Sequence, residues 1–530
     1  MINTEPTAEA RYLALSPARD RYLERARDCS ELTIPALIPR ERGNQGNDIP
    51  VPVQSNGAKG VNSLSSKLLL AMMPPNIPVF RLEKNEVAEK ILASQDPQVA
   101  KAAEEVKENL DRIPRAALLL TETYDHRPVI FEGMKHLIVG GNILFWFLDA
   151  KPHQGKIRAV PLSRYCVLRD SIGFVLEVVI QDTLNAANLP PKLAAILQTK
   201  KTEEEILKEA SQVRTESPSS PYYLYTYACW DPKTKKYNFK QEFMGETVEG
   251  STARYTVDSF PLVPLRFSAS DGEDYGRGLV EEYRGNLQSI EAISQSETAL
   301  AIVMSEVRWA VSAASPIRSR DLNASPQGAY IDAEPDSIKA ISAEKYGDLA
   351  AVAASKQSLQ RDFDMAFLVS TSIQRPGERV TAEEIRTMMQ LLDSTLGGLY
   401  SSLAAEFQRP YVQFQLRLLK ATQGIDIGKS GAIRPRIVTG IEALGQSAEA
   451  MQFVESQKVL SDLISPAEYA RVVNADAIAK KINGYWNVES AGLYKNQEQL
   501  AQEQAARDQA EQNKAAVAPI IGAVSKATSP

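Results

Sequence analysis

The sequence predicts a mixed α+β protein that is mainly helical, and three observations support this fold class. Strand-hairpin patterns and helix patterns alternate through the first 278 residues. Helical periodicity dominates the rest of the chain, and apolar residues recur every three or four positions from residue 380 to residue 423. With 530 residues, the chain is too long for one hydrophobic core, so we expect several domains.

The composition is that of an ordinary globular protein with a slightly acidic balance. Apolar residues make up 44% of the chain, charged residues make up 24%, and the net charge is −6. A domain that grips DNA phosphates tightly would be basic, so the charge argues against tight, sequence-independent DNA binding. The three cysteines, Cys29, Cys166 and Cys229, are far apart and form no Cys-x-x-Cys pair, which favours a reducing compartment.

Targeting and membrane signals are not expected in this sequence. The first 28 residues contain no apolar stretch of the kind found in a signal peptide. The longest apolar runs, such as Val139–Leu148, are too short to span a bilayer. We therefore predict no membrane insertion.

The N-terminal region is expected to hold two helices joined by extended chain. Residues 8–30 form a charged helical pattern, and Thr33–Pro39 is a Pro-bounded segment that we expect to be extended. Residues 57–74 predict a second helix. Its apolar face is expected to carry Val61, Leu64, Leu68 and Met72.

Strands and further helices complete the predicted α+β region. Gly140–Gly141 is expected to end one of these helices, because glycine readily adopts the left-handed C-cap conformation. Two hairpins are expected, at residues 165–182 and 222–243. The remaining predicted elements are strands at residues 77–82 and 143–148 and helices at residues 99–123, 130–139 and 201–214.

A helix, a Pro-rich insertion and a second helix follow. The first helix begins after residue 278, with Glu281 and Glu282 in its first turn, and runs to about Met304. The insertion is expected to contain one short strand, at residues 328–332, and the second helix runs from about residue 343 to residue 368. We expect neighbouring subunits to bury apolar side chains of these helices, among them Phe363.

The next segment is a short loop that leads into the long helix. Pro376 fixes its own φ, and Gly377 can adopt a positive φ without steric cost. The helix is expected to begin at a capping box formed by Thr381 and Glu384. Two features should bend it, namely the weak helix formers Gly397 and Gly398 and the missing amide of Pro410.

The C-terminal region is expected to be mostly helical. A strand is predicted at residues 433–439, followed by helices at residues 451–463 and 466–482. Residues 494–518 are rich in Gln, Glu and Ala, which is typical of a solvated helix or a frayed tail.

Motif searches give no indication of catalysis. Gly424 and Gly428-Lys429-Ser430 resemble a phosphate loop, but three residues separate the two glycines where the motif needs four. We therefore predict no nucleotide site and no other cofactor. The sequence also contains no Gly-x-Ser-x-Gly motif and no obvious Cys-His nucleophile pair, so no catalytic residue is assigned.

Metal binding is not expected either. His126, His136 and His153 form no His-x-x-x-His pair, so we interpret them as surface residues or hydrogen-bonded core residues. The acidic cluster Asp271, Glu273 and Asp274 could bind a cation in principle. We interpret it instead as a cap for the helix that follows.

Several of these stretches together resemble one protein family. RPGERVTAEEIR at residues 375–386, LLDSTLGGLYSSLAAEFQRP at residues 391–410, TIPALIP and GAKGVNSLSSKLLLAMMP look like parts of the portal proteins of T7-like short-tailed phages. The resemblance implies the phage portal fold, with a tunnel loop before a long kinked helix. It implies an α+β wing (1–278), a first stem helix (279–304), a clip (305–342), a second stem helix (343–369), the tunnel loop (370–379), a long kinked wing helix (380–423), and a helical crown with a C-terminal tail (424–530).

The same resemblance implies the function. Portal proteins, or head-to-tail connectors, form rings of about twelve copies at a capsid vertex, and double-stranded DNA passes through the ring. The implied partners are the terminase motor, the scaffolding protein, the major capsid protein, the tail adaptor protein and the internal core proteins. The implied location is the virion, after assembly in the host cytoplasm, and ATP hydrolysis would belong to the motor. The implied DNA-channel loop consists of Gln374, Arg375, Gly377, Glu378 and Arg379.

Two alternatives remain open from the sequence. Arg375 and Arg379 could contact phosphates transiently, or they could be solvent-exposed charges that pair with nearby glutamates. The whole chain could also be a soluble helical enzyme, or a nucleic-acid-processing factor with an unrecognised site.

Overall fold

A computed structural model describes the chain in two compact units, Met1–Ile441 and Glu442–Pro530. In the first unit it describes residues 6–40, 49–74, 78–84, 112–149, 153–184, 189–201, 222–305, 308–311, 320, 338–341, 346–369, 403–424 and 433–437. In the second unit it describes residues 453–460, 463 and 478, of which 453–460 are helical, within the predicted helix 451–463. The predicted helices 201–214 and 466–482 and the tail 494–518 lie mostly or wholly outside these ranges. All contacts below belong to the first unit.

The two predicted N-terminal helices are confirmed, as α1 (Ala8–Glu31) and α2 (Asn56–Met72). The Thr7 side chain accepts a hydrogen bond from Ala10 N and caps α1. Pro17 lies inside α1 and has no amide hydrogen to donate to the carbonyl oxygen of Leu13. The Ser16 hydroxyl donates to this oxygen instead, at 3.2 Å. All four apolar residues predicted for one face of α2 are buried.

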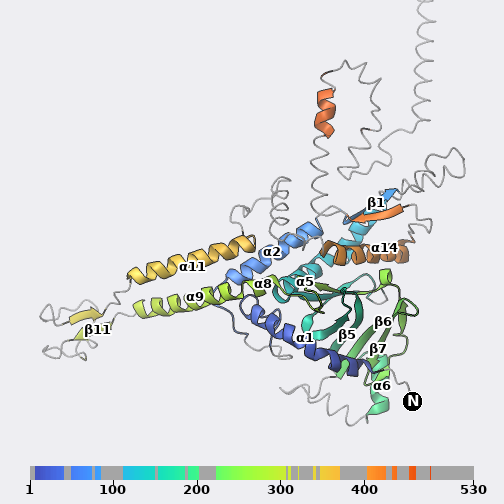
Figure 1. The fold of residues 1–530 in the computed structure, drawn as a ribbon, viewed down its shortest axis with the longest axis horizontal. Helices are drawn as coiled ribbons and strands as arrows, with labels where there is room; N and C mark the ends of the chain where they lie inside the picture. The colour runs from blue at the N-terminus through green and yellow to red at the C-terminus, as the bar shows by residue number, and fades with distance from the viewer. Residues whose placement is uncertain are drawn as a thin grey trace, which may run out of the picture. The chain divides into compact units, whose positions relative to one another are not determined.

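A six-stranded antiparallel sheet forms one half of the α+β body, and α1 lies against it (Figure 1). Both predicted hairpins are confirmed as consecutive strand pairs of this sheet. The Tyr12 side chain of α1 packs into a cluster with Cys166, Val179 and Tyr225 of the sheet. The strands are β4 (Tyr165–Arg169), β5 (Val175–Leu184), β6 (Tyr222–Asp231), β7 (Lys236–Phe243), β8 (Glu246–Thr247) and β9 (Ala253–Tyr255).

A three-stranded antiparallel sheet, in the order β10-β2-β3, forms the other half of the body. Its strands are β10 (Leu262–Arg266), β2 (Asn142–Phe147) and β3 (Ile157–Pro161). Helix α5 (His126–Gly140) precedes β2 and ends at Gly141, whose φ is +71°, as the Gly-Gly pattern predicts. The shorter elements are η1 (Leu162–Arg164), α6 (Pro191–Lys200) and η3 (Val257–Ser259), and residues 112–123 are helical.

A helical arm projects from the body, and we use this name for α9 (Arg284–Ser305), β11 (Arg308–Val311), β12 (Ile338–Ile341) and α11 (Tyr346–Ala366). Figure 1 shows α9 and α11 side by side, with the β11-β12 pair at their far end. The prediction of one continuous helix from residue 279 is wrong, because α8 (Leu279–Glu282) ends at Tyr283 before α9 begins. The predicted strand 328–332 lies outside the described residues, and the sequence did not predict β11 or β12.

Two further predictions need correction. Thr33–Pro39 is not extended; it winds into turns, with hydrogen bonds from Thr33 N to Ser30 O and from Leu37 N to Ile34 O. The strand predicted at residues 77–82 is β1 (Phe80–Lys84), and it pairs antiparallel with β13 (Ile433–Ile437). The end of the long helix is described as η4 (Ala404–Gln408) and α14 (Arg409–Gln423).

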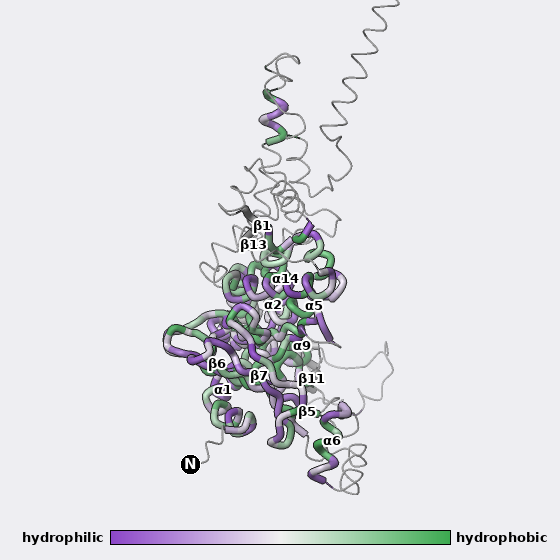
Figure 2. Tube along the Cα trace, turned by 90° about the vertical axis from the view of Figure 1, so that its right-hand side faces the viewer, coloured by the Kyte–Doolittle hydropathy of each residue, from purple (hydrophilic) through white to green (hydrophobic). Residues whose placement is uncertain are grey.

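Hydropathy varies along the described elements rather than forming one continuous apolar segment (Figure 2). Within the described ranges, none of the helices combines the length and the apolar character that crossing a bilayer requires.

Candidate functional site

Most residues singled out for function from the sequence lie outside the described residues. These are the channel-loop residues Gln374, Arg375, Gly377, Glu378 and Arg379, the capping residues Thr381 and Glu384, and the glycines Gly397 and Gly398. Pro410 is described, at the start of α14. The structure therefore describes two regions on either side of the loop in the sequence, namely the root of the helical arm and the end of the long helix.

The helix changes its geometry directly before Pro410. Residues Ala404–Gln408 form a π-helix, and Pro410 occupies the first turn of α14. A regular α-helix would need the amide of residue 410 to donate to the carbonyl of Glu406, and proline has no amide hydrogen. A π-turn is a common place for a helix to change direction and is frequent at functional sites. The assignment of Pro410 to a hinge stays a prediction.

Aromatic side chains anchor this helix end to the three-stranded sheet. Phe407 lies 5.1 Å from Phe145 between ring centroids, and Phe414 stacks on Phe147 at 4.9 Å. Tyr411 stacks on Phe407 one turn later at 5.6 Å, and all five rings are almost fully buried. Residues 407, 411 and 414 lie on one helix face, as their spacing predicts, so the packing fixes the rotation of α14 on the sheet.

A buried hydrogen-bond network surrounds the Tyr411 hydroxyl. The His126 Nε2 lies 2.7 Å from Gly155 O and must donate to it, so Nδ1 of the neutral ring accepts from the Tyr411 hydroxyl at 2.9 Å. Gln415 Nε2 donates to Tyr411 Oη at 2.9 Å and to Thr121 Oγ1 at 2.7 Å. Burial lowers the pKa of His126. This histidine is therefore a hydrogen-bonded core residue that ties α14 to the start of α5.

The root of the arm is a tight contact between α11 and α2. Phe363 and Phe367 stack at 4.2 Å, and Tyr283 meets Phe367 edge to face at 5.6 Å. A Cβ atom at Gly60 of α2 would lie 2.5 Å from Phe363 Cε1, so only glycine allows this approach. The Lys67 ammonium of α2 donates to Leu368 O, and burial lowers the pKa of Lys67.

This packing overturns the expectation for Phe363. The side chain is fully buried inside its own subunit, against α2 and Phe367, so no neighbouring subunit is needed to cover it. Farther along the arm, α11 contacts α9 through Lys356, whose ammonium lies 2.6 Å from Glu297 Oε2. Asn286 Nδ2 also donates to Leu359 O at 3.2 Å. The arm is therefore held by aromatic packing at its root and by polar contacts along its length.

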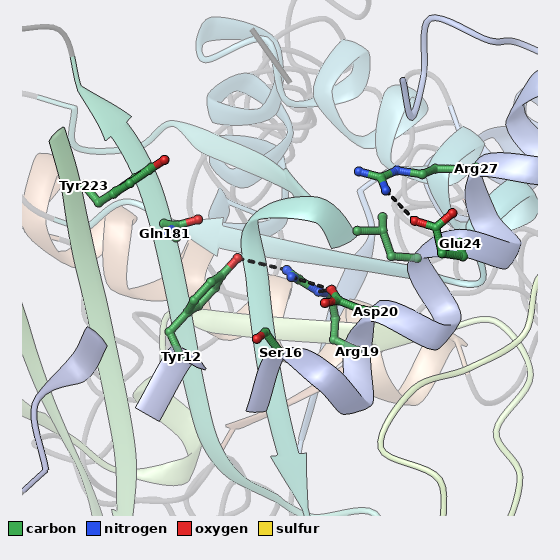
Figure 3. A pocket seen from close by; sticks show the side chains of 9 residues that line it. Tyr12, Ser16, Arg19, Asp20, Glu24, Arg27, Gln181 and Tyr223 are labelled. Atoms are coloured by element: carbon green, nitrogen blue, oxygen red, sulfur yellow. Dashed lines mark hydrogen bonds and ion pairs between the residues drawn. The ribbon is translucent and has the colours of Figure 1, made fainter. Parts of the chain in front are cut away.

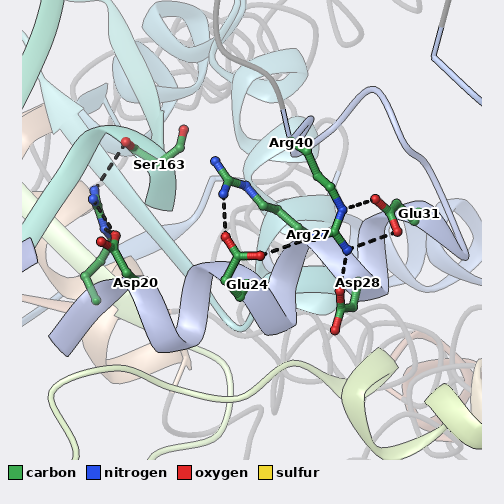
Figure 4. Close-up of polar contacts among 8 residues, drawn as sticks. Asp20, Glu24, Arg27, Asp28, Glu31, Arg40 and Ser163 are labelled. Atoms are coloured by element: carbon green, nitrogen blue, oxygen red, sulfur yellow. Dashed lines mark hydrogen bonds and ion pairs between the residues drawn. The ribbon is translucent and has the colours of Figure 1, made fainter. Parts of the chain in front are cut away.

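Ion pairs connect α1 to the same root. Arg25 Nη1 lies 3.0 Å from Glu281 Oε1 of α8, and Arg284 Nη2 lies 2.9 Å from Asp28 Oδ2. Arg40 folds back over α1 and bonds Asp28, Glu24 and Glu31 (Figure 4). Each such pair is partly exposed and contributes little alone. The pairs of Arg25 and Arg284 join α1 to α8 and to the first turn of α9, whereas the pairs of Arg40 hold the chain after α1 against α1 itself.

A groove of about 370 Å³ runs between α1 and the six-stranded sheet (Figure 3). Arg19 lies deep in it, donating to the Tyr12 hydroxyl at 3.0 Å and to Ser163 O at 3.2 Å, and pairing with Asp20 at 2.7 Å. Arg27 is paired with Glu24 at 2.6 Å. The two arginines and the two carboxylates cancel in charge, so the lining does not select an anion or a cation.

The acidic cluster does not cap a helix, which corrects the sequence interpretation. Gly278 occupies the N-cap of α8 and makes no side-chain cap bond. Asp274 Oδ1 instead accepts from Arg169 N at 2.7 Å, and Glu273 pairs with Arg277 at 3.0 Å. Among the residues that the structure describes, no group of three His, Cys, Asp or Glu side chains is arranged to hold a metal ion.

The fold and these contacts can be compared with known proteins. A family model described as bacteriophage head to tail connecting protein matches residues 5–491. The match spans the α+β body, the arm and the long helix, so the chain belongs to this family. The membership agrees with the sequence expectation of a structural protein and does not support the alternative of an enzyme.

Individual relatives give the same result. The portal protein of Escherichia phage T7 is 31% identical over 502 residues, which cover 94% of this chain and 90% of that protein. The portal protein of Enterobacteria phage T3 is 31% identical, over 93% of this chain and 89% of that protein. The portal protein of Enterobacteria phage SP6 is 28% identical, over 94% of this chain and 91% of that protein. The predicted resemblance to portal proteins is therefore confirmed.

Solved structures show a distant likeness. A chain from the neck of an empty GTA particle, computed with C6 symmetry, has a TM-score of 0.36 and 12% identity, over 79% of this chain and 89% of that chain. A chain from the neck of a native GTA particle, computed with C12 symmetry, has a TM-score of 0.34 and 12% identity, over 78% of this chain and 88% of that chain.

Proposed function

We propose that the chain assembles into a closed ring at one capsid vertex, that double-stranded DNA passes through this ring during packaging and ejection, and that the tail attaches to it. The observation that carries the proposal is the match to the head-to-tail connecting family over residues 5–491, supported by relatives that are named portal proteins. A protein of this kind is a component of the virion, assembled in the host cytoplasm.

The ring would contain about twelve copies. Twelve chains of 58.3 kDa give about 700 kDa, and twelve charges of −6 give about −72, before bound ions are considered. A ring with this net charge repels DNA phosphates on average. Repulsion suits a conduit through which DNA slides, because no deep electrostatic minimum holds the polymer.

We assign the parts of the ring as follows. The α+β body with α1 is the wing, α9 and α11 are the stem, and the β11-β12 end of the arm is the clip. The clip would meet the terminase motor and later the tail adaptor protein. Other surfaces would meet the scaffolding protein, the major capsid protein and the internal core proteins.

Deletion of residues 315–333 is expected to impair docking of the motor or the tail while the α+β body stays folded. Unchanged packaging would contradict the assignment of the clip.

The ring itself is tested by particle size and shape. Size-exclusion chromatography with light scattering should give a particle of about 700 kDa, and negative-stain images should show rings with a central channel. A monomer or small oligomer with measurable enzymatic turnover would contradict the proposed function.

The loop at residues 374–379 is proposed to grip or gate the DNA. Arg375 and Arg379 would touch phosphates, while Gly397 and Gly398 lower the cost of bending the long helix by about 1–2 kcal/mol relative to alanines. Arg375→Ala with Arg379→Ala, and separately Gly397→Ala with Gly398→Ala, should leave ring formation intact and reduce DNA packaging or retention. If heads built with both variants package and hold full-length DNA like the parent, the gate hypothesis is wrong, although the portal assignment would survive.

A further inference from the structure

Helix α2 contacts the chain on both sides of residues 370–402. The described residues end at Val369 after α11 and resume at Leu403 before η4. The first end is bonded to α2 through Leu368, and the second end is bonded to α2 through Gln408. Figure 1 shows α2 between α11 and α14. One helix therefore holds the chain at both ends of this segment.

The end of α11 is a strained turn. Leu368 N donates to Met365 O at 3.2 Å, and Val369 N donates to Asp364 O at 2.7 Å, which is the bond pattern of a Schellman C-cap. This cap places Leu368 in the left-handed region, with a φ of +55°, where glycine is the usual residue. Such a conformation persists only where the surroundings hold it, and the Leu368 side chain is only 3% exposed. The turn therefore depends on the contacts that the rest of the fold makes with Leu368.

Two side chains of α2 bind the carbonyl oxygen of this turn. The Lys67 ammonium and the Ser63 hydroxyl both donate to Leu368 O, the hydroxyl at 3.4 Å. This oxygen lies beyond the last turn of α11, where carbonyl groups have no donor within the helix. Ser63 and Lys67 lie three and seven residues after Gly60, so they share the face of α2 that packs on α11. A charge-assisted hydrogen bond thus fixes Leu368 on α2 in addition to the aromatic packing.

The other end of the segment is bonded to the last turn of α2. Gln408 is fully buried, and its Nε2 donates to Met72 O at 2.7 Å. Carbonyl groups in the last turn of a helix lack donors within that helix, so this bond satisfies a buried acceptor. Gln408 is also the last residue of the π-helix η4, directly before α14. Lys67 and Met72 are five residues apart, so the two anchor points lie within about 7.5 Å along α2.

We propose that α2 positions the loop at residues 374–379, with Lys67 and Gln408 as the two positioning residues. This role rests on the proposed function, in which that loop contacts DNA. A segment whose two ends are held close together on one helix has fewer conformations than a segment with a free end. Loss of either bond changes where the segment starts or ends, and neither residue has to touch DNA for this role.

Limited proteolysis of the purified chain tests both anchors without DNA. Lys67→Met and Gln408→Met each remove a hydrogen-bond donor and keep an unbranched side chain of similar length. Each variant should raise the rate of protease cleavage within residues 370–402 at least fivefold, because a freed end lets the segment open more often. Lys67→Arg, which restores a charged donor, should return the rate to that of the parent.

The chain offers a matched control for each anchor. Lys59→Met removes an exposed lysine two turns earlier on α2. Gln415→Met removes a second buried glutamine of the same helix end, which is 1% exposed and bonds Thr121 and Tyr411 instead of α2. Both controls should leave the cleavage rate within twofold of the parent.

DNA retention separates a positioning role from a merely structural one. In heads built with ring-forming variants, Lys67→Met and Gln408→Met should lower the fraction that holds full-length DNA at least fivefold, whereas both controls should match the parent. If Lys67→Met does not fold, Ser63→Ala, which removes the weaker donor, should still raise cleavage about twofold. Cleavage at the control rate, or faster cleavage with parental DNA retention, would overturn the positioning role and leave the proposed function intact. A parent protein that forms no ring would overturn the proposed function and this role with it.

Discussion

Gly60 is the position at which α2 and the root of the arm approach most closely. Replacing it by alanine adds one methyl group, at 2.5 Å from Phe363 Cε1, 2.8 Å from Phe363 Cζ and 3.2 Å from Phe367 Cβ. Alanine is favoured over glycine inside a helix by about 1 kcal/mol. Forcing a methyl group into a packed contact costs about 1–3 kcal/mol. Gly60→Ala should therefore destabilise the protein by up to about 2 kcal/mol, despite the better helix former.

Two companion variants isolate the cause. Gly285 lies at the start of α9, and a methyl group there would have no neighbouring atom within 4 Å, so Gly285→Ala should show only the helix gain of about 1 kcal/mol. Phe363→Leu removes the ring atoms that the new methyl group would meet. The double variant Gly60→Ala with Phe363→Leu should be less destabilised than the sum of its single variants, by about 0.5–3 kcal/mol.

Thermal unfolding of the purified chain, with limited proteolysis to follow the arm, measures these effects. We expect the unfolding midpoint to fall for Gly60→Ala and to rise for Gly285→Ala, by a smaller amount per kcal/mol than in a small domain because the chain has 530 residues. If Gly60→Ala stabilises the protein as much as Gly285→Ala does, or if Phe363→Leu shows no coupling to it, the close contact between α2 and α11 is wrong.

Three further predictions concern buried groups. Phe363→Ala should cost about 3–5 kcal/mol in thermal or denaturant unfolding because its ring is fully buried, whereas Met365→Ala should change stability by less than about 0.5 kcal/mol. Tyr411→Phe should cost about 1–3 kcal/mol in the same assay, because the buried Nδ1 of His126 loses its donor; a neutral result would contradict the network. Burial lowers the pKa of His136 to about 4, against about 6.5 in an unfolded chain, so stability should fall as the pH drops from about 6.5 to about 4. The unfolding midpoint of His136→Gln should depend less on pH in this range than that of the parent. If both midpoints fall equally with pH, the acid sensitivity belongs to other groups.

Local signals in the sequence are sufficient to predict the family and several of the helices and strands. The apolar face of α2, both hairpins of the large sheet and the glycine at the end of α5 follow from spacing and turn chemistry. The face of α14 that carries Tyr411 and Phe414 follows from the same periodicity. Motifs near residues 375–410 supplied the resemblance to portal proteins, and the match over residues 5–491 confirms it.

Which groups meet could be learned only from the folded chain. Phe363 faces α2 of its own subunit, Asp274 bonds Arg169 N rather than a helix end, and His126 pairs with Tyr411. Each of these contacts joins residues that are far apart in the chain, and helical or strand periodicity shows that a side chain is buried without showing its partner. The break at Tyr283 was likewise missed, because no local pattern marks it and it depends on how the helices pack against the body. Pro410 predicted that the long helix is disturbed, but not that the disturbance is a π-turn at Ala404–Gln408.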